Sequence, residues 1–167
     1  MLLDQNDRVW ISTVLGVFVA SKQDFLKQVR GQKDNVFTQV VSDRNVWKLV
    51  QYKDDAFWMG TNKGLYQLSK KASGWEYEHI LEPHNGFTEI SDKKIAAIAK
   101  DESGNLWLSS VYAGALYLGI KSADIFAIQN ERSDEEKTLT SHVVWALAET
   151  EPNKLWIGTE NGLNHYD

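Results

Sequence analysis

Apolar and polar residues follow a β-strand pattern along short stretches of this chain, and the stretches return at a regular interval. Apolar side chains recur closely in VWKLV (46–50) and VVWAL (143–147), as in half-buried β-strands. Turn-forming sequences come next, and each is followed by a second apolar run, a glycine turn and a third run. A fourth apolar run begins near Phe25, Trp75 and Ile125. The pattern therefore predicts four strands in each period.

Tryptophan marks this period. Four of the seven tryptophans open similar phrases, WISTVLGVF, WMGTNKGLY, WLSSVYAGALY and WIGTENGLN, at intervals of 48, 49 and 49 residues: Trp10, Trp58, Trp107 and Trp156. Upstream segments align without a gap and bring Trp47, Ala96 and Trp145 into a second common phase. A small residue two positions after each repeat tryptophan indicates close approach of neighbouring sheets: Ser12, Gly60, Ser109 and Gly158. The glycine turns predict positive φ angles at Gly16, Gly64, Gly114 and Gly162.

Two segments have locally helical composition, SKQDFLKQVRGQ (21–32) and DKKIAAIAKDES (92–103). The equivalent positions in the sister repeats carry β-branched or aromatic residues with turn residues at the ends. We therefore predict strands in both segments.

A Trp- and Gly-marked unit of four antiparallel strands in 40 to 50 residues is the blade of a β-propeller. The sequence predicts an all-β propeller fragment of roughly three and a half four-stranded antiparallel blades. We expect a partial blade lacking its inner strand at 1–33, blades at 34–92 and 93–141, and a partial blade lacking its outer strand at 142–167. Because a closed propeller needs roughly four to eight blades, we expect the uncovered sheets to meet the remainder of a longer propeller or a second copy of this chain.

Composition and charge narrow the classes of function. The net charge is −5 and the basic residues are scattered, so nucleic acid is an unsuitable partner. The chain has no cysteine, which excludes disulfides and thiolate metal sites but leaves the compartment open. No apolar run approaches the length of a membrane helix, so we expect no membrane contact by this segment.

Motifs for catalysis, cofactors and metals do not occur. The chain has no nucleophile elbow, phosphate loop or dinucleotide fingerprint, so we predict no catalytic residues and no cofactor. The histidines lack metal-binding spacing, so we predict no metal site: His79, His84, His142 and His165. Acidic residues recur at one repeat phase, and turn formation explains them better than acid catalysis or calcium binding: Asp54, Asp55, Asp101, Glu102, Glu149 and Glu151.

The candidate ligand site lies in the loops that lead into the inner strands, which we call the lead-in loops. Arg44, Lys93 and His142 stand two residues before successive inner strands, and all three side chains can carry positive charge. In a propeller the lead-in loops and the turns after the repeat tryptophans surround the mouth of the central channel, so we add residues of those turns as ligand-binding candidates: Asn62, Lys63, Tyr112, Glu160 and Asn161. The alternative is that polar loop residues recur because duplicated loops begin alike.

The phrase HVVWALAETEPNKLWIGTENGLNHYD (142–167) and its relatives around Trp58 and Trp107 resemble the two-component regulator propeller repeat. Repeats of this family occur in periplasmic sensor regions of hybrid histidine kinases and membrane-bound diguanylate cyclases of bacteria. The resemblance extends over essentially the whole chain, with departures from the pattern at Ser12, Ser109, Ser110 and Ala113.

The resemblance implies a non-enzymatic sensory segment in the periplasm. Such a segment binds an extracytoplasmic small molecule, a saccharide or an anionic compound, and relays the event to a downstream signalling domain. The alternative is a scaffold propeller for protein–protein interaction. A propeller lyase or glycosidase is a third class, for which the sequence offers only His142, Tyr112 and Glu160, in different blades.

Overall fold

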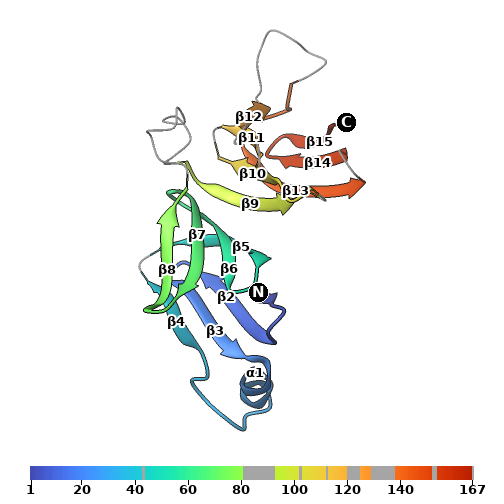
Figure 1. Ribbon diagram of the computed structural model, residues 1–167. Helices are drawn as coiled ribbons and strands as arrows, with labels where there is room; N and C mark the ends of the chain where they lie inside the picture. The colour runs from blue at the N-terminus through green and yellow to red at the C-terminus, as the bar shows by residue number, and fades with distance from the viewer. Residues whose placement is uncertain are drawn as a thin grey trace.

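The described residues form four antiparallel sheets, arranged one after another from the first sheet at the bottom of Figure 1 to the fourth at the upper right. The computed structural model describes residues 1–42, 44–80, 93–101, 103–111, 113–119, 125–128, 138–151 and 154–166. Within each sheet every strand pairs with its neighbour in the sequence. This up-and-down pattern confirms the predicted all-β propeller blades.

The strands of the first two sheets have the following bounds. The first sheet contains β1 (Leu2–Leu3), β2 (Arg8–Thr13), β3 (Gly16–Ser21) and β4 (Thr38–Ser42). The second contains β5 (Val46–Lys53), β6 (Ala56–Thr61), β7 (Gly64–Lys71) and β8 (Gly74–His79).

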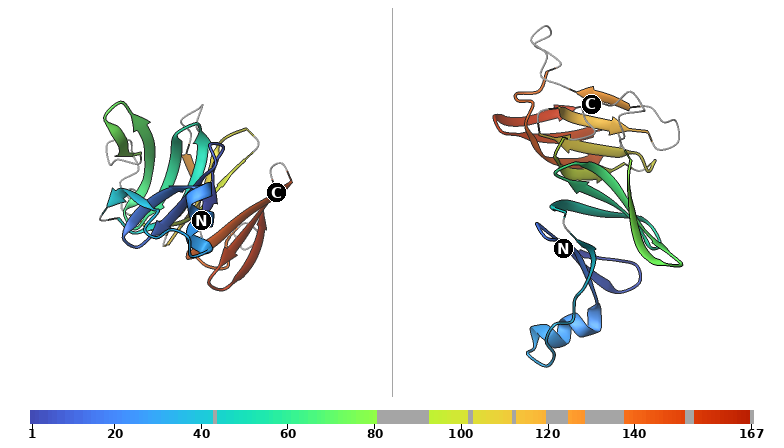
Figure 2. Two further views of the ribbon diagram at one scale, coloured as in Figure 1. Left: turned by 90° about the horizontal axis from the view of Figure 1, so that it is seen from below. Right: turned by 90° about the vertical axis from the view of Figure 1, so that its left-hand side faces the viewer.

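The last two sheets follow the same scheme. The third contains β9 (Ile95–Lys100), β10 (Leu106–Ser110), β11 (Gly114–Leu118) and β12 (Ile125–Ile128). The fourth contains β13 (Val144–Glu151), β14 (Lys154–Thr159) and β15 (Gly162–Tyr166). The strands of each sheet form a layer that packs face to face with the next sheet (Figure 2).

The repeat tryptophans lie in the second strand of every sheet and fill the space between successive sheets. Trp10 belongs to one apolar cluster with residues of the second sheet, and its ring centroid lies 4.4 Å from that of Phe57. Trp58 and Trp107 join clusters with the third and fourth sheets in the same way. The exposed fraction is 0% for Trp10, 6% for Trp58 and 7% for Trp107, but 38% for Trp156 in the fourth sheet. The core therefore consists of layers between sheets.

Close approach of the second and third sheets requires a small residue two positions after the repeat tryptophan of the second sheet, at Gly60. A Cβ atom added at Gly60 in β6 would lie 2.7 Å from the carbonyl oxygen of Ile95, the first residue of β9. At the equivalent Gly158 the nearest atom would be the Cβ of Ala146, at 3.4 Å. The predicted turn glycines also have positive φ, from 75° at Gly114 to 143° at Gly162.

The first sheet corrects the prediction of a strand near Phe25. Residues Lys22–Val29 form helix α1, between β3 and β4. Ser21 caps the helix, because its Oγ accepts a hydrogen bond from the Asp24 amide at 3.1 Å, and Lys27 lies in the last turn. No residue of α1 is buried, so local helix propensity decides the conformation.

The second segment of helical composition (92–103) contains a strand, as predicted. Residues Ile95–Lys100 form β9, in which Ile95 and Ile98 are 0% and 4% exposed in the layer against the second sheet. Here tertiary packing outweighs the helix propensity of the alanines and lysines. The two segments therefore differ in burial, which their similar compositions do not reveal.

The expected division of the first blade at residue 33 is also wrong. β4 (Thr38–Ser42) pairs with β3, so the first sheet continues past α1 to residue 42. The first sheet does not lack an inner strand either, because β1 pairs with β2 with Leu2 opposite Trp10. The insertion of α1 moved the outer strand downstream, beyond the point that the repeat length predicts.

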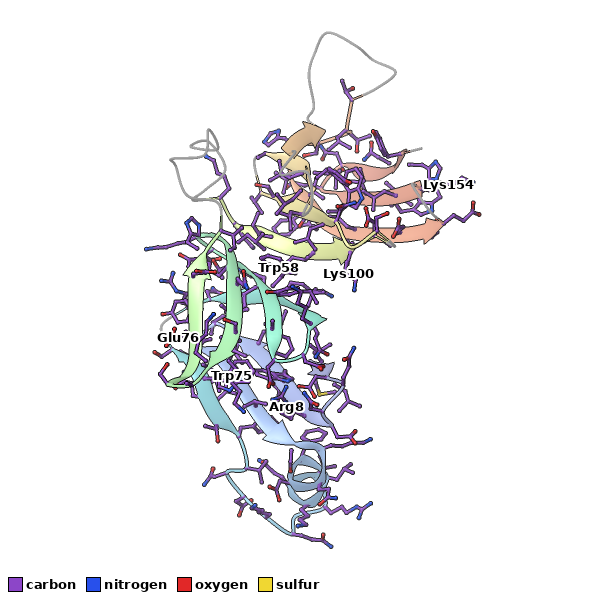
Figure 3. All side chains as sticks on the ribbon, viewed as in Figure 1. Arg8, Trp58, Trp75, Glu76, Lys100 and Lys154 are labelled. Carbon is purple, nitrogen blue, oxygen red and sulfur yellow. The ribbon has the colours of Figure 1, made fainter. Side chains whose placement is uncertain are left out.

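A buried carboxylate connects the first two sheets. Asp4, 6% exposed, accepts hydrogen bonds from Trp10 Nε1 at 2.7 Å and from Arg8 Nε at 2.6 Å. Arg8 also forms an ion pair of 2.6 Å with Asp55 of the second sheet and lies 5.5 Å from the ring centroid of Trp75 (Figure 3). Burial raises the pKa of Asp4, but the hydrogen bonds from Trp10 and Arg8 outweigh it, and its pKa lies below the ordinary value.

The equivalent turn of the third sheet uses an aspartate in the same place. Asp101, six residues before Trp107 as Asp4 is six before Trp10, accepts hydrogen bonds from the amide of Asn105 at 2.8 Å and from its Nδ2 at 2.9 Å. This geometry agrees with the interpretation of Asp101 as a turn residue.

The close approach at Gly60 predicts a difference between two equivalent glycines. We expect Gly60→Ala to lower the free energy of unfolding by about 1–3 kcal/mol, because the new methyl overlaps the backbone of β9. Gly158→Ala is the matched control, with an expected change within about 0.5 kcal/mol. Urea unfolding followed by tryptophan fluorescence measures both, and equal losses in the two variants would show that Gly60 is not a close-contact position.

The Asp4 network predicts a pH dependence of stability. Because the pKa of Asp4 is lowered in the folded state, its contribution is present above the unfolded-state value of about 3.9 and is lost as the pH falls through the folded-state value. We expect Asp4→Asn to lower the free energy of unfolding by about 1–3 kcal/mol at pH 7. The difference between the two proteins should shrink between about pH 4 and pH 2. A difference that stays constant over this range would contradict the assignment.

Candidate functional site

The lead-in loops and the turns after the repeat tryptophans lie at one end of the sheets. Within a sheet, the amide of Asn62 donates to the carbonyl of Asn45 at 3.3 Å. Between sheets, the amide of Gly64 donates to the carbonyl of Lys93 at 3.0 Å, and Gly114 makes the same contact with His142 at 3.1 Å. The lead-in loops of the third and fourth sheets are thus held against the turns of the preceding sheets, which places these loops and turns side by side.

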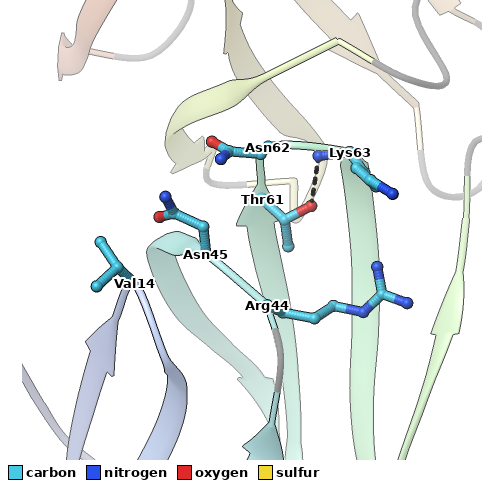
Figure 4. Close-up of a pocket in the computed structure, with 6 residues that line it drawn as sticks. All are labelled: Val14, Arg44, Asn45, Thr61, Asn62 and Lys63. Carbon is cyan, nitrogen blue, oxygen red and sulfur yellow. Dashed lines mark hydrogen bonds between the residues drawn. The ribbon is translucent and has the colours of Figure 1, made fainter.

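A pocket of about 390 Å³ lies among these loops, between the first and second sheets. Figure 4 shows the side chains that line it: Val14, Arg44, Asn45, Thr61, Asn62 and Lys63. Thr61 fixes the turn, because its Oγ1 donates to the Gly64 carbonyl at 3.0 Å and accepts from the Lys63 amide at 3.0 Å. The pocket therefore joins a cationic side chain and an amide from the turn, Lys63 and Asn62, with a cationic side chain and an amide from the lead-in loop, Arg44 and Asn45.

Arg44 is fixed by two tyrosines of the second sheet. Its NH1 group donates to the Tyr66 hydroxyl at 2.9 Å, and its guanidinium carbon lies 4.4 Å from the Tyr66 ring centroid and 5.1 Å from that of Tyr77. Figure 4 shows the side chain directed toward β7. The guanidinium is half-buried against aromatic rings, and it contributes a fixed positive charge to one wall of the pocket.

The structure brings three of the predicted site residues to this pocket: Arg44, Asn62 and Lys63. Lys93 and His142 stand on the next two lead-in loops at the same end of the sheets. Glu160 and Asn161 are exposed in the turn between β14 and β15. Tyr112 lies outside the described residues. The described candidates thus lie on successive loops, and three of them meet in the pocket between the first two sheets.

An aromatic cluster next to the pocket was not among the predicted site residues. Trp47 Nε1 donates a hydrogen bond to Asn62 Oδ1 at 2.6 Å, and the Lys94 ammonium lies 3.4 Å from the Trp47 ring centroid. The same ammonium lies 4.8 Å from the ring centroid of Trp145. A smaller pocket of about 180 Å³ includes Trp47, Trp10 and Ser12 in its lining. The common repeat phase of Trp47 and Trp145 was the available signal, but the sequence does not show their exposure.

The part of the chain that the structure describes contains no cluster of metal ligands and no helix that could span a membrane. No group of three or more His, Asp or Glu side chains there is arranged to hold a metal ion, and His84 lies outside the described residues. The described helix α1 is too short to cross a bilayer, and no other helix there is long and apolar enough.

Comparison with known families identifies the repeat. Residues 138–161, which contain the fourth lead-in loop, β13 and β14, match the family described as "Two component regulator propeller". This match confirms the predicted family resemblance. No curated protein sequence matches the chain.

Solved structures with the same fold include bacterial surface and signalling proteins. The extracellular domain described as hybrid two component system BT4673 from B. thetaiotaomicron aligns with a TM-score of 0.72 and 16% identity, covering 98% of this chain and 20% of that one. PorZ, a surface component of the type-IX secretion system of Porphyromonas gingivalis, aligns with a TM-score of 0.70 and 14% identity, covering 99% and 25%. The chain therefore spans a fifth to a quarter of these proteins and has the fold of a propeller fragment.

Proposed function

We propose that this segment of two-component regulator propeller type binds a small anionic ligand outside the cytoplasm, without catalysing a reaction on it. The pocket between the first two sheets carries the proposal, because Arg44 and Lys63 bring two positive charges to one cavity of about 390 Å³. In this proposal the segment lies in the periplasm and relays binding to a downstream signalling domain. The likeness in fold to the extracellular domain of BT4673 and to PorZ, a surface component, supports that compartment.

The chemistry of the lining favours a carboxylate or a sulfate on a polar molecule. Guanidinium and ammonium groups form strong charge-assisted hydrogen bonds with such anions. The amides of Asn45 and Asn62 offer donors and acceptors for hydroxyl groups, as a saccharide would require. The volume lies within the range of ordinary small-molecule sites, about 300–1,000 Å³.

The position of the pocket supplies a route for the signal. It is lined from both the first sheet, by Val14, and the second sheet, by Arg44 and Lys63. A ligand that contacts both sheets favours one relative orientation of them, and the layered core passes a change of orientation to the next sheet.

A scaffold function is the second candidate, favoured by the fourth sheet. On the face of this sheet that carries Trp156, the side chains of Trp156 and Leu163 are 38% and 64% exposed. In this alternative the surface meets the remainder of a propeller or a second copy of the chain. Concentration-dependent dimerisation in sedimentation velocity, abolished by Trp156→Ala, would favour it.

Calorimetric titration tests the proposed ligand class. The probes are galacturonate and N-acetylglucosamine 6-sulfate, with galactose and N-acetylglucosamine as neutral partners. We expect at least one anionic probe to bind more tightly than its neutral partner and to bind about 10- to 100-fold more weakly to Lys63→Ala. Lys71→Ala, at the other end of β7, is the control and should leave the affinity unchanged.

Two results would contradict the proposal. The first is equal affinity for the charged and neutral members of each pair. The second is an affinity for the anionic probe that does not change in Lys63→Ala.

A further inference from the structure

Two exposed tryptophans and one lysine converge near the starts of three successive inner strands. Trp47 is the second residue of β5, Trp145 is the second residue of β13, and Lys94 directly precedes β9. The Lys94 ammonium lies 3.4 Å from the ring centroid of Trp47 and 4.8 Å from that of Trp145. We call these three residues the Trp–Lys cluster. It combines side chains from the second, third and fourth sheets.

The exposure of these indoles distinguishes them from the structural tryptophans. Trp47 and Trp145 are 44% and 47% exposed, whereas Trp10, Trp58 and Trp107 are at most 7% exposed. Burial stabilises a protein by about 25 cal/mol for each Å² of apolar surface that it removes from water. The exposed parts of these two indoles do not contribute that stabilisation. Packing between sheets therefore does not account for the large aromatic rings at these two positions.

The third sheet carries a small residue at the repeat position of the two tryptophans. Ala96 occupies the repeat position of Trp47 and Trp145, on β9, and β9 packs against both β5 and β13. An aromatic ring at that position would compete with Lys94 for the faces of the flanking indoles. The methyl side chain of Ala96 instead leaves a lysine as the group that contacts both rings.

The Lys94 ammonium of this cluster is available to bind an anion. Within the described residues Lys94 forms no ion pair, and its contacts are the two aromatic faces. A cation over an aromatic face remains attracted to it while its N–H groups still donate hydrogen bonds. Ring contacts that restrict the lysine side chain reduce the entropy lost when an anion binds.

Trp47 is fixed as well. Its Nε1 donates to Asn62 Oδ1 at 2.6 Å, and this hydrogen bond sets the plane of the indole. A ring held in one orientation offers a flat surface on which the apolar face of a ligand can stack.

We propose that Trp47, Lys94 and Trp145 form a second binding site, for a small molecule that combines a flat apolar ring face with one carboxylate or sulfate. The indoles stack on the ring face, and the Lys94 ammonium pairs with the anion. Two kinds of compound have this chemistry, aromatic carboxylates and sugar acids. The site adjoins the pocket that Lys63 lines, through the hydrogen bond from Trp47 to Asn62, but none of its three residues lines that pocket, so the two sites are tested independently.

Titration calorimetry with matched probe pairs tests the site. The aromatic pair is 2-naphthoate and 2-naphthamide, and the sugar pair is methyl β-D-glucuronide and methyl β-D-glucoside. We expect at least one anionic probe to bind with a dissociation constant of about 1 mM or lower and to outcompete its neutral partner. Binding of the naphthoate alone assigns the site to aromatic carboxylates, and binding of the glucuronide alone assigns it to sugar acids.

Four variants locate the bound probe. Lys94→Gln should weaken the anionic probe about 10-fold with little change for the neutral one, and Trp145→Ala should weaken both. Lys100→Gln, at the far end of the same strand (Figure 3), should change neither. Lys63→Ala should also leave the affinity unchanged, because it alters the other pocket.

The following outcomes would overturn the proposal. The first is the absence of saturable binding by either anionic probe up to about 10 mM. The second is an affinity that is the same in Lys94→Gln and the unaltered protein, while circular dichroism shows that the variant is folded. The third is a larger loss of affinity in Lys63→Ala than in Lys94→Gln, which would place the probe in the other pocket and leave the proposed function intact.

Discussion

Each sheet of this protein buries an indole against the sheet that follows it, and the arrangement of the other elements depends on that contact. Trp10, Trp58 and Trp107 have a successor sheet and are almost fully buried, whereas Trp156 is 38% exposed. A single four-stranded sheet cannot cover both of its faces, so stability comes from the layers between neighbouring sheets. Gly60 shows how closely the backbones approach, and Arg8 adds an ion pair between the first two sheets.

The functional surfaces follow from this stacking. Because successive sheets pack in the same orientation, their lead-in loops and turns meet at one end, where Gly64 and Gly114 hydrogen-bond the next loop. The stacking also brings Trp47, Lys94 and Trp145 together, although each lies in a different sheet. Tryptophans at the two repeat positions therefore serve different purposes. The indoles of the second strands hold the sheets together, and the indoles of the inner strands remain open to ligands.

The sequence predicts the repeat and the strands well, because a hydrophobic period that recurs four times constrains the fold more strongly than local propensity. β9 follows the repeat although its composition favours helix, since Ile95 and Ile98 enter the core. α1 departs from the repeat because none of its residues is buried. At the site, the positions of Arg44, Asn62 and Lys63 could be predicted from loop phase. The direction of Arg44 toward Tyr66 could not, because it depends on a side-chain contact across 22 residues of sequence.

The most direct test compares two tryptophans that share one repeat position but differ in their neighbours. We expect Trp107→Ala, which empties the layer between the third and fourth sheets, to lower the free energy of unfolding by about 3–5 kcal/mol. Trp156→Ala, on the exposed face of the fourth sheet, should cost less than about half as much. Denaturant unfolding of the two variants, followed by far-ultraviolet circular dichroism, gives both values. Equal losses would contradict the claim that contacts between successive sheets hold this fold together.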